Sequence, residues 1–218
     1  MNEQELQAGR EAALVKYKKD KAAMRQWMLA KGFHDALDAM NLAEQHHVGY
    51  RKDGMQPEPH HQIRISLMVR NLPDLMHREE CLVTSYTHDL IEDCGFEPSD
   101  VRNRFGPLVG DASVAMSKKI RGIVRSEDEI FADMTRSPIA SILKPVDRDD
   151  NLGHMRGVFD PTKRLGYADF AERRIIPMIK EARGIFHKQD AAYGILRHII
   201  RERVAYEREI AQLNGVAA

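Results

Sequence analysis

Helical periodicity is the feature that most constrains the fold of this chain. Apolar residues recur at helical spacing along nearly its whole length, and no stretch alternates as a convincing β-strand would. We expect helices at residues 2–30, 34–47, 60–72, 79–92, 98–105, 108–118, 126–135, 139–150, 167–186 and 189–213. The stretch 48–59 contains two Gly and two Pro and is expected to be a long loop. The predicted fold class is therefore all-α.

Charge and composition narrow the possible partners and the compartment. The 33 basic side chains balance the 33 acidic ones, so no global field would recruit nucleic acid or an anionic membrane. The N-terminal segment is charged throughout, and no run of 18 apolar residues occurs, which predicts a cytoplasmic protein. Cys81 and Cys94 have neither metal-site spacing nor a disulfide framework, so two free thiols in a reducing compartment are expected.

The segment from Thr87 to Asp93 carries the strongest chemical signal. On a continuous helix, four of its polar residues would fall within roughly 140° of arc and share one face: His88, Asp89, Glu92 and Asp93. Three carboxylates crowded beside an imidazole repel one another when partly buried, unless they share a cation. A solvated acidic face is the alternative interpretation of this segment alone.

Further candidate ligands lie elsewhere in the chain. His60 opens the helix after the loop, and Asp147 lies in the helix at 139–150. With His88 and Asp89 they make a set of two imidazoles and two carboxylates, which suits Mn²⁺, with Zn²⁺ and Fe²⁺ as alternatives. Arg51 and Lys52 in the loop could bind a phosphate, although alone they would equally suit a solvated turn.

The order of these residues resembles that of a known family, the HD-type hydrolase domain of RelA/SpoT enzymes, which remove the 3′ pyrophosphate from (p)ppGpp. The resemblance spans about residues 36–156 and is carried by the following motifs: Ala43-x-x-His46, Arg51-Lys52-Asp53-Gly54, His60, His88-Asp89-x-x-Glu92-Asp93, Phe105-Gly106 and Asp147-Arg148-x-x-Asn151. The HD dipeptide alone marks a large superfamily, but the loop motif combined with it is more specific. Because 218 residues leave no room for a synthetase domain, the chain resembles a stand-alone small alarmone hydrolase, similar in scope to the metazoan SpoT homologue.

The resemblance implies a role for each matching residue. It implies a helical HD domain at 34–186, an N-terminal helical extension at 1–33 and a C-terminal helix at 187–218 that packs on the core or on a second subunit in a homodimer. It makes His60, His88, Asp89 and Asp147 the ligands of one Mn²⁺, and counting from Gly54 selects His60 over His61. It makes Glu92 and Asp93 the groups that activate water, and it assigns the nucleotide pocket to Arg51, Lys52 and Asn151. One of His46 and His47 is expected to face the site from the helix before the loop, and His46 is taken as the candidate substrate-binding residue.

One segment departs from the family pattern. Residues 149–153 read Asp-Asp-Asn-Leu-Gly where the family often has Leu-x-Asn-Met-Arg, which adds two acids and removes an arginine near the pocket. The expected function is a metal-dependent (p)ppGpp 3′-pyrophosphohydrolase that acts on a small-molecule nucleotide. The departure keeps two alternatives open: an HD phosphohydrolase acting on another nucleotide, such as (p)ppApp, NADPH or a deoxynucleoside triphosphate, and a non-catalytic nucleotide sensor.

Overall fold

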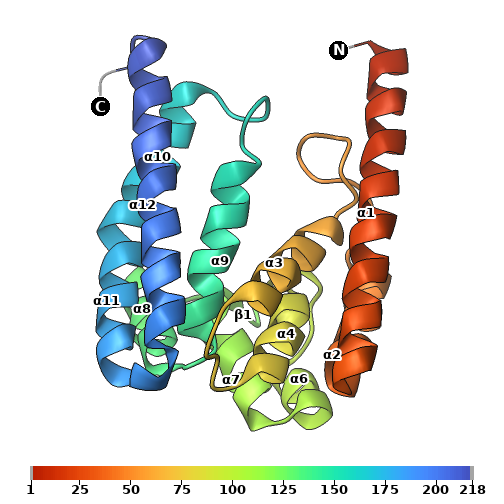
Figure 1. Ribbon diagram of the computed structural model, residues 1–218, viewed down its shortest axis with the longest axis vertical. Helices are drawn as coiled ribbons and strands as arrows, with labels where there is room; N and C mark the ends of the chain where they lie inside the picture. The colour runs from red at the N-terminus through yellow and green to blue at the C-terminus, as the bar shows by residue number, and fades with distance from the viewer. Residues whose placement is uncertain (1, 217–218) are drawn as a thin grey trace.

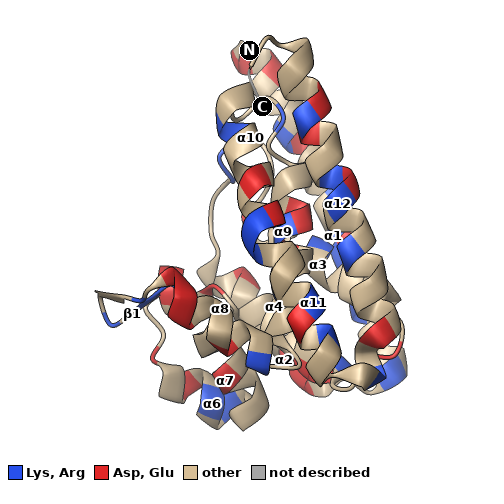
Figure 2. Ribbon diagram, turned by 90° about the vertical axis from the view of Figure 1, so that its left-hand side faces the viewer, with Lys and Arg blue, Asp and Glu red and all other residues tan. Residues whose placement is uncertain are grey.

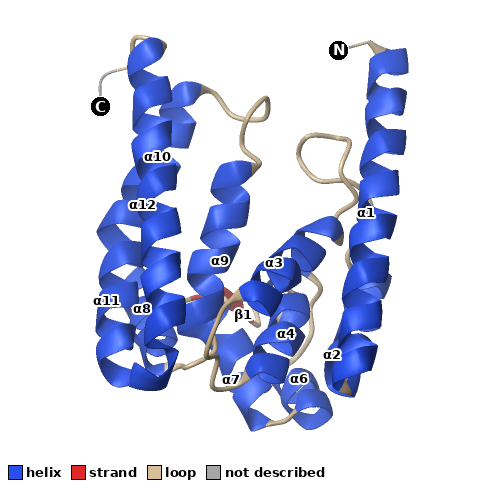
Figure 3. Cartoon of the chain, viewed as in Figure 1, coloured by secondary structure: helices blue, strands red, loops and turns tan. Residues whose placement is uncertain are grey.

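The computed structural model describes residues 2–216 and has an all-α fold (Figure 3). Residue 1 and residues 217 and 218, at the outer ends of the predicted terminal segments, lie outside the described part. The elements in chain order are α1 (Glu3–Lys31), α2 (His34–His46), α3 (His60–Asn71), α4 (Arg78–Thr87), α5 (Leu90–Asp93), α6 (Pro98–Phe105), α7 (Pro107–Met116), β1 (Lys119–Ile120), β2 (Ile123–Val124), α8 (Glu127–Arg136), α9 (Ala140–Gly153), α10 (Pro161–Phe170), a π-helical turn η1 (Ala171–Ile175), α11 (Ile176–Ile185), a 3₁₀ turn η2 (His187–Gln189) and α12 (Asp190–Leu213).

Local sequence signals explain where several helices begin and end. The side chains of Asn2 and Ser126 each accept a hydrogen bond from the backbone N–H of a glutamate three residues on. The side chain of that glutamate accepts one from the backbone N–H of Asn2 or Ser126, so N–H groups at the starts of α1 and α8 are satisfied. Gly32 ends α1 in the left-handed conformation at φ 72°, where a side chain would be strained. The predicted long helix at 2–30 is thus confirmed.

Helix α9 lies in the middle of the molecule (Figure 1). It packs against α3, α4 and α7 on one side and against α11 and α12 on the other. Fully buried apolar side chains fill the space between these helices, among them Leu82, Tyr86, Leu143 and Tyr193. The central position matters because α9 carries Asp147, so this carboxylate comes from the helix that joins the two sides.

The terminal helices cover opposite sides of the bundle (Figure 1). Helix α12 packs on α9, α10 and α11, whereas α1 packs on α2 and α3. The buried side chains of α1, Tyr17, Met24 and Met28, all lie in its C-terminal half. In its N-terminal half, Arg10 donates to the carbonyl of Gly54 at 2.9 Å and so reaches the loop at 48–59. No helix in the described part of the chain is both long enough and apolar enough to cross a membrane.

Three local predictions differ from the structure. The helix expected at 167–186 begins earlier, at Pro161, and is divided into α10 and α11 by η1. The helix expected at 79–92 is divided into α4 and α5 by a turn at His88 and Asp89, and Asp89 adopts φ −96° and ψ −7°, a sparsely populated region where active-site residues recur. The chain between α7 and α8 forms an antiparallel hairpin of β1 and β2, which protrudes from the body of the molecule (Figure 2). Strands of two residues are too short to show an alternating pattern, so they could not be predicted from apolar spacing.

Candidate metal and phosphate site

The two adjacent histidines of α3 point to different neighbours. Successive residues of a helix are about 100° apart, and α3 packs against both α1 and α9. His60 therefore faces α1, where its Nε2 lies 3.0 Å from Asp20. His61 faces α9, with Nδ1 2.7 Å from Asp150 and Nε2 3.3 Å from Asp147. The structure thus places His61, and not the predicted His60, beside the other candidate ligands.

His61, His88 and Asp89 form a cluster that could hold a metal ion. One ligand atom from each lies within 4.8 Å of the other two, and the cluster joins α3, which carries His61, to the turn between α4 and α5, which carries His88 and Asp89. His88 Nδ1 lies 3.0 Å from the Ser85 carbonyl, which accepts only a proton donor, so this nitrogen carries the hydrogen. Nε2 of His88 is buried, lies 3.0 Å from Asp89 Oδ2 and has no hydrogen-bond partner in the described part of the chain. Two acceptors that face each other fit a shared cation.

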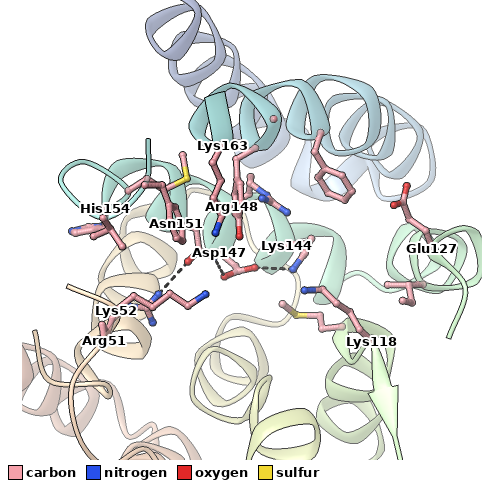
Figure 4. A pocket seen from close by; sticks show the side chains of 18 of the residues that line it. Arg51, Lys52, Lys118, Glu127, Lys144, Asp147, Arg148, Asn151, His154 and Lys163 are labelled. Atoms are coloured by element: carbon pink, nitrogen blue, oxygen red, sulfur yellow. Dashed lines mark hydrogen bonds and ion pairs between the residues drawn. The ribbon is translucent and has the colours of Figure 1, made fainter. Parts of the chain in front are cut away.

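Asp147 joins this cluster to the loop that carries the predicted phosphate ligands. Its carboxylate accepts from Lys144 Nζ at 2.8 Å and from Asn151 Nδ2 at 2.7 Å. Asn151 in turn accepts from Arg51 at 3.2 Å. Three residues predicted from sequence, Arg51, Asp147 and Asn151, therefore lie in one chain of hydrogen bonds (Figure 4).

The electrostatic environment keeps the carboxylates of the cluster ionised. Burial alone would raise the pKa of Asp89, but His88 and His61 outweigh it and hold the pKa below its usual range. Burial is likewise outweighed at Asp147, where Lys144 and His61 keep the pKa well below its ordinary value. Burial lowers the pKa of His61, yet hydrogen bonds to Asp147 and Asp150 prevail and raise it to about 9. The ionised carboxylates thus favour a proton on His61, and a metal ion bound at its Nε2 would replace that proton.

The histidine pair at the end of α2 also separates into two environments. His46, predicted to bind substrate, is exposed, and its ring packs edge-on against Phe96 at 4.8 Å. His47 is buried, and burial lowers its pKa to about 4, with further effects from the charges of Asp89, His88 and His61. Its Nε2 has no hydrogen-bond partner. His47 is thus a further candidate metal ligand at the edge of the cluster.

The two predicted water-activating carboxylates lie on α5, next to Asp89. Glu92 is partly buried and accepts a hydrogen bond from the backbone of Lys118 at 2.8 Å, which ties α5 to the start of the hairpin. Asp93 is at the surface, and desolvation together with the charges of Asp89 and Glu92 raises its pKa. A carboxylate with a raised pKa accepts a proton more readily than an ordinary one.

A cavity of about 960 Å³ adjoins the cluster at Asp147 (Figure 4). Among its lining residues are seven basic side chains, of which only the first two were predicted: Arg51, Lys52, Lys118, Arg125, Lys144, Arg148 and Lys163. Aromatic side chains form another part of its wall: Tyr50, Phe131, Phe159, Tyr167 and Phe170. Five of the basic residues were missed because they are scattered over 118–163 and only the folded chain brings them together.

The guanidinium of Arg148 occupies a particular place in this wall. It lies 5.2 Å from the ring centroid of Tyr167 and 4.7 Å from that of Phe170. Burial lowers its pKa, and its Nε has no hydrogen-bond partner within residues 2–216. A desolvated cation held among aromatic rings is suited to an anionic or aromatic ligand.

The unusual acids of the 149–153 segment point away from the cavity. Asp149 pairs with Arg203 of α12 at 2.7 Å, and Asp150 pairs with His61 and Arg64 of α3. Neither acid lines the cavity, whereas the next residue along the chain, Asn151, does. The two additional negative charges therefore do not oppose an anionic ligand directly. Position 153, where the family often has an arginine, is a glycine in this chain. A Cβ atom at this position would lie 3.2 Å from the guanidinium of Arg203.

No family model matches the chain, and no curated protein matches it significantly.

Proposed function

We propose that the chain is a metal-dependent phosphohydrolase whose substrate is a nucleotide with a pyrophosphate group, in the first place a (p)ppGpp 3′-pyrophosphohydrolase. The observation that carries this proposal is the convergence of His61, His88 and Asp89, with Asp147 beside them, at the edge of a large basic cavity. Imidazoles and carboxylates of this kind suit Mn²⁺, with Zn²⁺ and Fe²⁺ as alternatives. The two free thiols, Cys81 and Cys94, are consistent with the reducing cytoplasm that we include in the proposal.

The basic residues of the cavity would bind and orient the phosphates. Arg51 offers a planar fork of donors, and Lys52 and Lys144 offer ammonium groups on either side of Asp147 (Figure 4). The aromatic wall with Arg148 would take the base by stacking. The cavity is large enough for a nucleotide, because typical ligand sites have about 300–1,000 Å³.

The acidic residues would then prepare water for attack on phosphorus. A divalent cation held by the cluster would supply Lewis-acid stabilisation and acidify water. Glu92 or Asp93 takes the proton of the attacking water, and Asn151 holds the Asp147 carboxylate in place through its hydrogen bond. Attack on the 3′ phosphorus breaks its bond to the ribose 3′ oxygen, which takes up a proton and leaves as GDP, while the attacked group is released as pyrophosphate. Arg51 and Lys52 balance the negative charge on the phosphoryl oxygens during this step.

A second candidate is hydrolysis of another nucleotide by the same residues. Gly153 is the observation that favours it, because the missing arginine would change the contacts made by the base or the distal phosphates. The candidates on this side are (p)ppApp, NADPH and deoxynucleoside triphosphates. A nucleotide sensor without catalytic activity is the third hypothesis, and it belongs to a different functional class.

A turnover assay with defined metal content tests the proposal. Metal-stripped protein is supplied with Mn²⁺ and incubated in parallel with ppGpp, ppApp, NADPH and deoxynucleoside triphosphates, and the products are identified by chromatography. We expect GDP and pyrophosphate from ppGpp, and loss of both products in Asp89→Ala. Turnover of a different nucleotide would favour the second candidate. Nucleotide binding without any product, in the presence of Mn²⁺, Fe²⁺, Co²⁺ or Zn²⁺, would contradict the enzyme and favour the sensor.

A further inference from the structure

A buried carboxylate that the proposed reaction does not use lies directly behind His61. Asp150 is 9% exposed, and its Oδ2 lies 2.7 Å from Nδ1 of His61. On its other side Arg64 makes a two-pronged contact, with Nε 2.6 Å from Oδ1 and Nη2 2.8 Å from Oδ2. The guanidinium fork occupies both carboxylate oxygens, so the orientation of Asp150 is fixed.

This contact leaves His61 only one nitrogen for the cluster. Because the ionised Asp150 can only accept, Nδ1 of His61 carries the hydrogen of this bond. Nε2 is then the nitrogen that points toward Asp147, at 3.3 Å. His88 is oriented in the same way, through an Nδ1 hydrogen bond to the Ser85 carbonyl. Both imidazoles of the cluster thus present Nε2, but only His61 is held by a charged group.

The contacts of Arg64 extend this network to the phosphate-binding loop. Its Nη1 donates to the side chain of Gln56 at 2.6 Å, and Gln56 donates to Asp53 at 2.8 Å. Asp53 also accepts from the backbone of Met55 and Gln56, which fixes the turn that follows Lys52. One continuous set of hydrogen bonds therefore joins His61 to the loop that carries Arg51 and Lys52.

We infer that Asp150 is a positioning residue that, clamped by Arg64, holds the Nδ1 proton of His61 and so presents Nε2 to the cation. This inference rests on the proposed metal site and adds an orienting group to it. Partners that orient metal-bound histidines in this way raise the basicity of the ligand and are typically worth 10–100-fold in metal affinity or activity. Asp150 belongs to the segment that departs from the family pattern, so the additional acid has a function in the site.

The chain offers a matched control for the test. Asp149 is the neighbouring acid on α9, is 13% exposed and is also paired with an arginine, Arg203, but it contacts neither His61 nor the cavity. We expect Asp150→Asn to weaken Mn²⁺ binding by about 10–100-fold, measured by the electron paramagnetic resonance signal of free Mn²⁺ at fixed pH. Asp149→Asn is expected to bind Mn²⁺ within about twofold of the wild type. Equal affinity in folded Asp150→Asn and in the wild type would overturn the inference.

A spectroscopic measurement separates positioning from general support of the fold. In the Zn²⁺-loaded, ¹⁵N-labelled wild type, we expect a slowly exchanging Nδ1 proton on His61 and a metal-shifted Nε2 resonance. Asp150→Asn has a single oxygen for the three donors of His61 and Arg64, so this proton is expected to exchange faster or to leave Nδ1. An unchanged Nδ1 resonance in this variant would contradict the inference.

Two further outcomes have a clear meaning. If Asp150→Asn does not fold, Arg64→Gln loosens the clamp and leaves the carboxylate in place; weaker Mn²⁺ binding then supports the inference, and wild-type affinity overturns it. A wild-type protein that binds none of Mn²⁺, Fe²⁺, Co²⁺ and Zn²⁺ would overturn the proposed function, and the inference with it. A wild type that binds the ion while Asp150→Asn binds it equally well overturns the inference alone.

Discussion

Helix α3 divides two regions that contain the same residue types but differ in how their donors and acceptors are matched. On the α1 side, which we call the outer seam, Asp20 accepts a hydrogen bond from Nε2 of His60, and Tyr17 and Lys21 both donate to Glu44. On the α9 side, which we call the inner cluster, the buried Nε2 of His88 faces the carboxylate of Asp89 without a donor between them.

The difference shows which feature distinguishes a candidate site from ordinary packing. A histidine beside an acid occurs in both regions, so the pair alone is uninformative. In the outer seam the carboxylates of Asp20 and Glu44 meet hydrogen-bond donors, and Nδ1 of His60 is the buried nitrogen left without a partner among residues 2–216. In the inner cluster, two buried imidazole nitrogens, Nε2 of His88 and Nε2 of His47, have no partner among these residues, and the first of them faces a carboxylate, Asp89. A surplus of acceptors is what a bound cation would resolve.

Separate substitutions of the two adjacent histidines, His60 and His61, should give the largest difference in activity. His61→Gln is expected to lower kcat/KM by about a thousandfold or more, because the stabilisation that a metal ion gives to a phosphoryl transition state is worth several kcal/mol. His60→Gln, its matched control in the outer seam, should retain turnover within about tenfold. Steady-state kinetics on the Mn²⁺-loaded variants measure both. The reverse ranking would mean that the outer seam, and not the inner cluster, holds the ion.

Substitutions of one glutamate on each side, Glu92 and Glu44, should give the next largest difference in kcat. Glu92→Gln should lower kcat by about a hundredfold or more through loss of the proton acceptor, with Mn²⁺ affinity nearly unchanged. Glu44→Gln removes a carboxylate from the outer seam and should leave kcat within about twofold. Equal turnover of Glu92→Gln and the wild type would exclude Glu92 as the general base.

Tyr17→Phe probes the outer seam by stability instead of activity. The variant removes a hydroxyl that donates to Glu44 at 2.7 Å, so the free energy of unfolding should fall by about 1 kcal/mol. Urea unfolding at pH 7 measures the change, and turnover serves as the control that should stay constant. A loss of turnover much greater than the loss of stability would show that the two regions are coupled through α3.

The smallest expected effect is a pH dependence that belongs to the outer seam. Burial opposes ionisation of Glu44, but the hydrogen bonds from Lys21 and Tyr17 prevail and hold its pKa below its ordinary value of 4.5. The folded state therefore binds its proton less readily than the unfolded state, and this stabilisation is complete above about pH 4.5 and lost as the pH falls through the folded-state pKa. The stability of Glu44→Gln should decline less than that of the wild type between pH 5 and pH 3. Parallel declines would contradict this assignment.

Most helices could be predicted because their apolar spacing and end signals are local. The turn at His88 and Asp89 could not be predicted, because only the dihedral angles of Asp89 depart from those of a regular helix and no Gly or Pro marks the interruption in the sequence. Within the site, Arg51, Asp147 and Asn151 were identified and come together in the fold. Counting along a loop chose His60 where the structure brings His61, because a shift of one residue rotates a side chain by about 100° on a helix. Lys144, Arg148 and the aromatic wall come from segments that only tertiary packing brings to the cavity.

The π-helical turn η1, which connects α10 to α11, has a consequence for the cavity wall. A π turn contains more residues than an α turn, so the helical phase after Ala171–Ile175 is offset from the phase before it. This offset lets one nearly continuous rod satisfy two directions: Tyr167 and Phe170 in α10 face the cavity, while Ile179 and Ala182 in α11 lie fully buried in the core. Removing the additional residue of this turn would rotate α11 relative to α10 by about 100°, so the ligand-facing and the core-facing side chains of this stretch would no longer both be placed as they are.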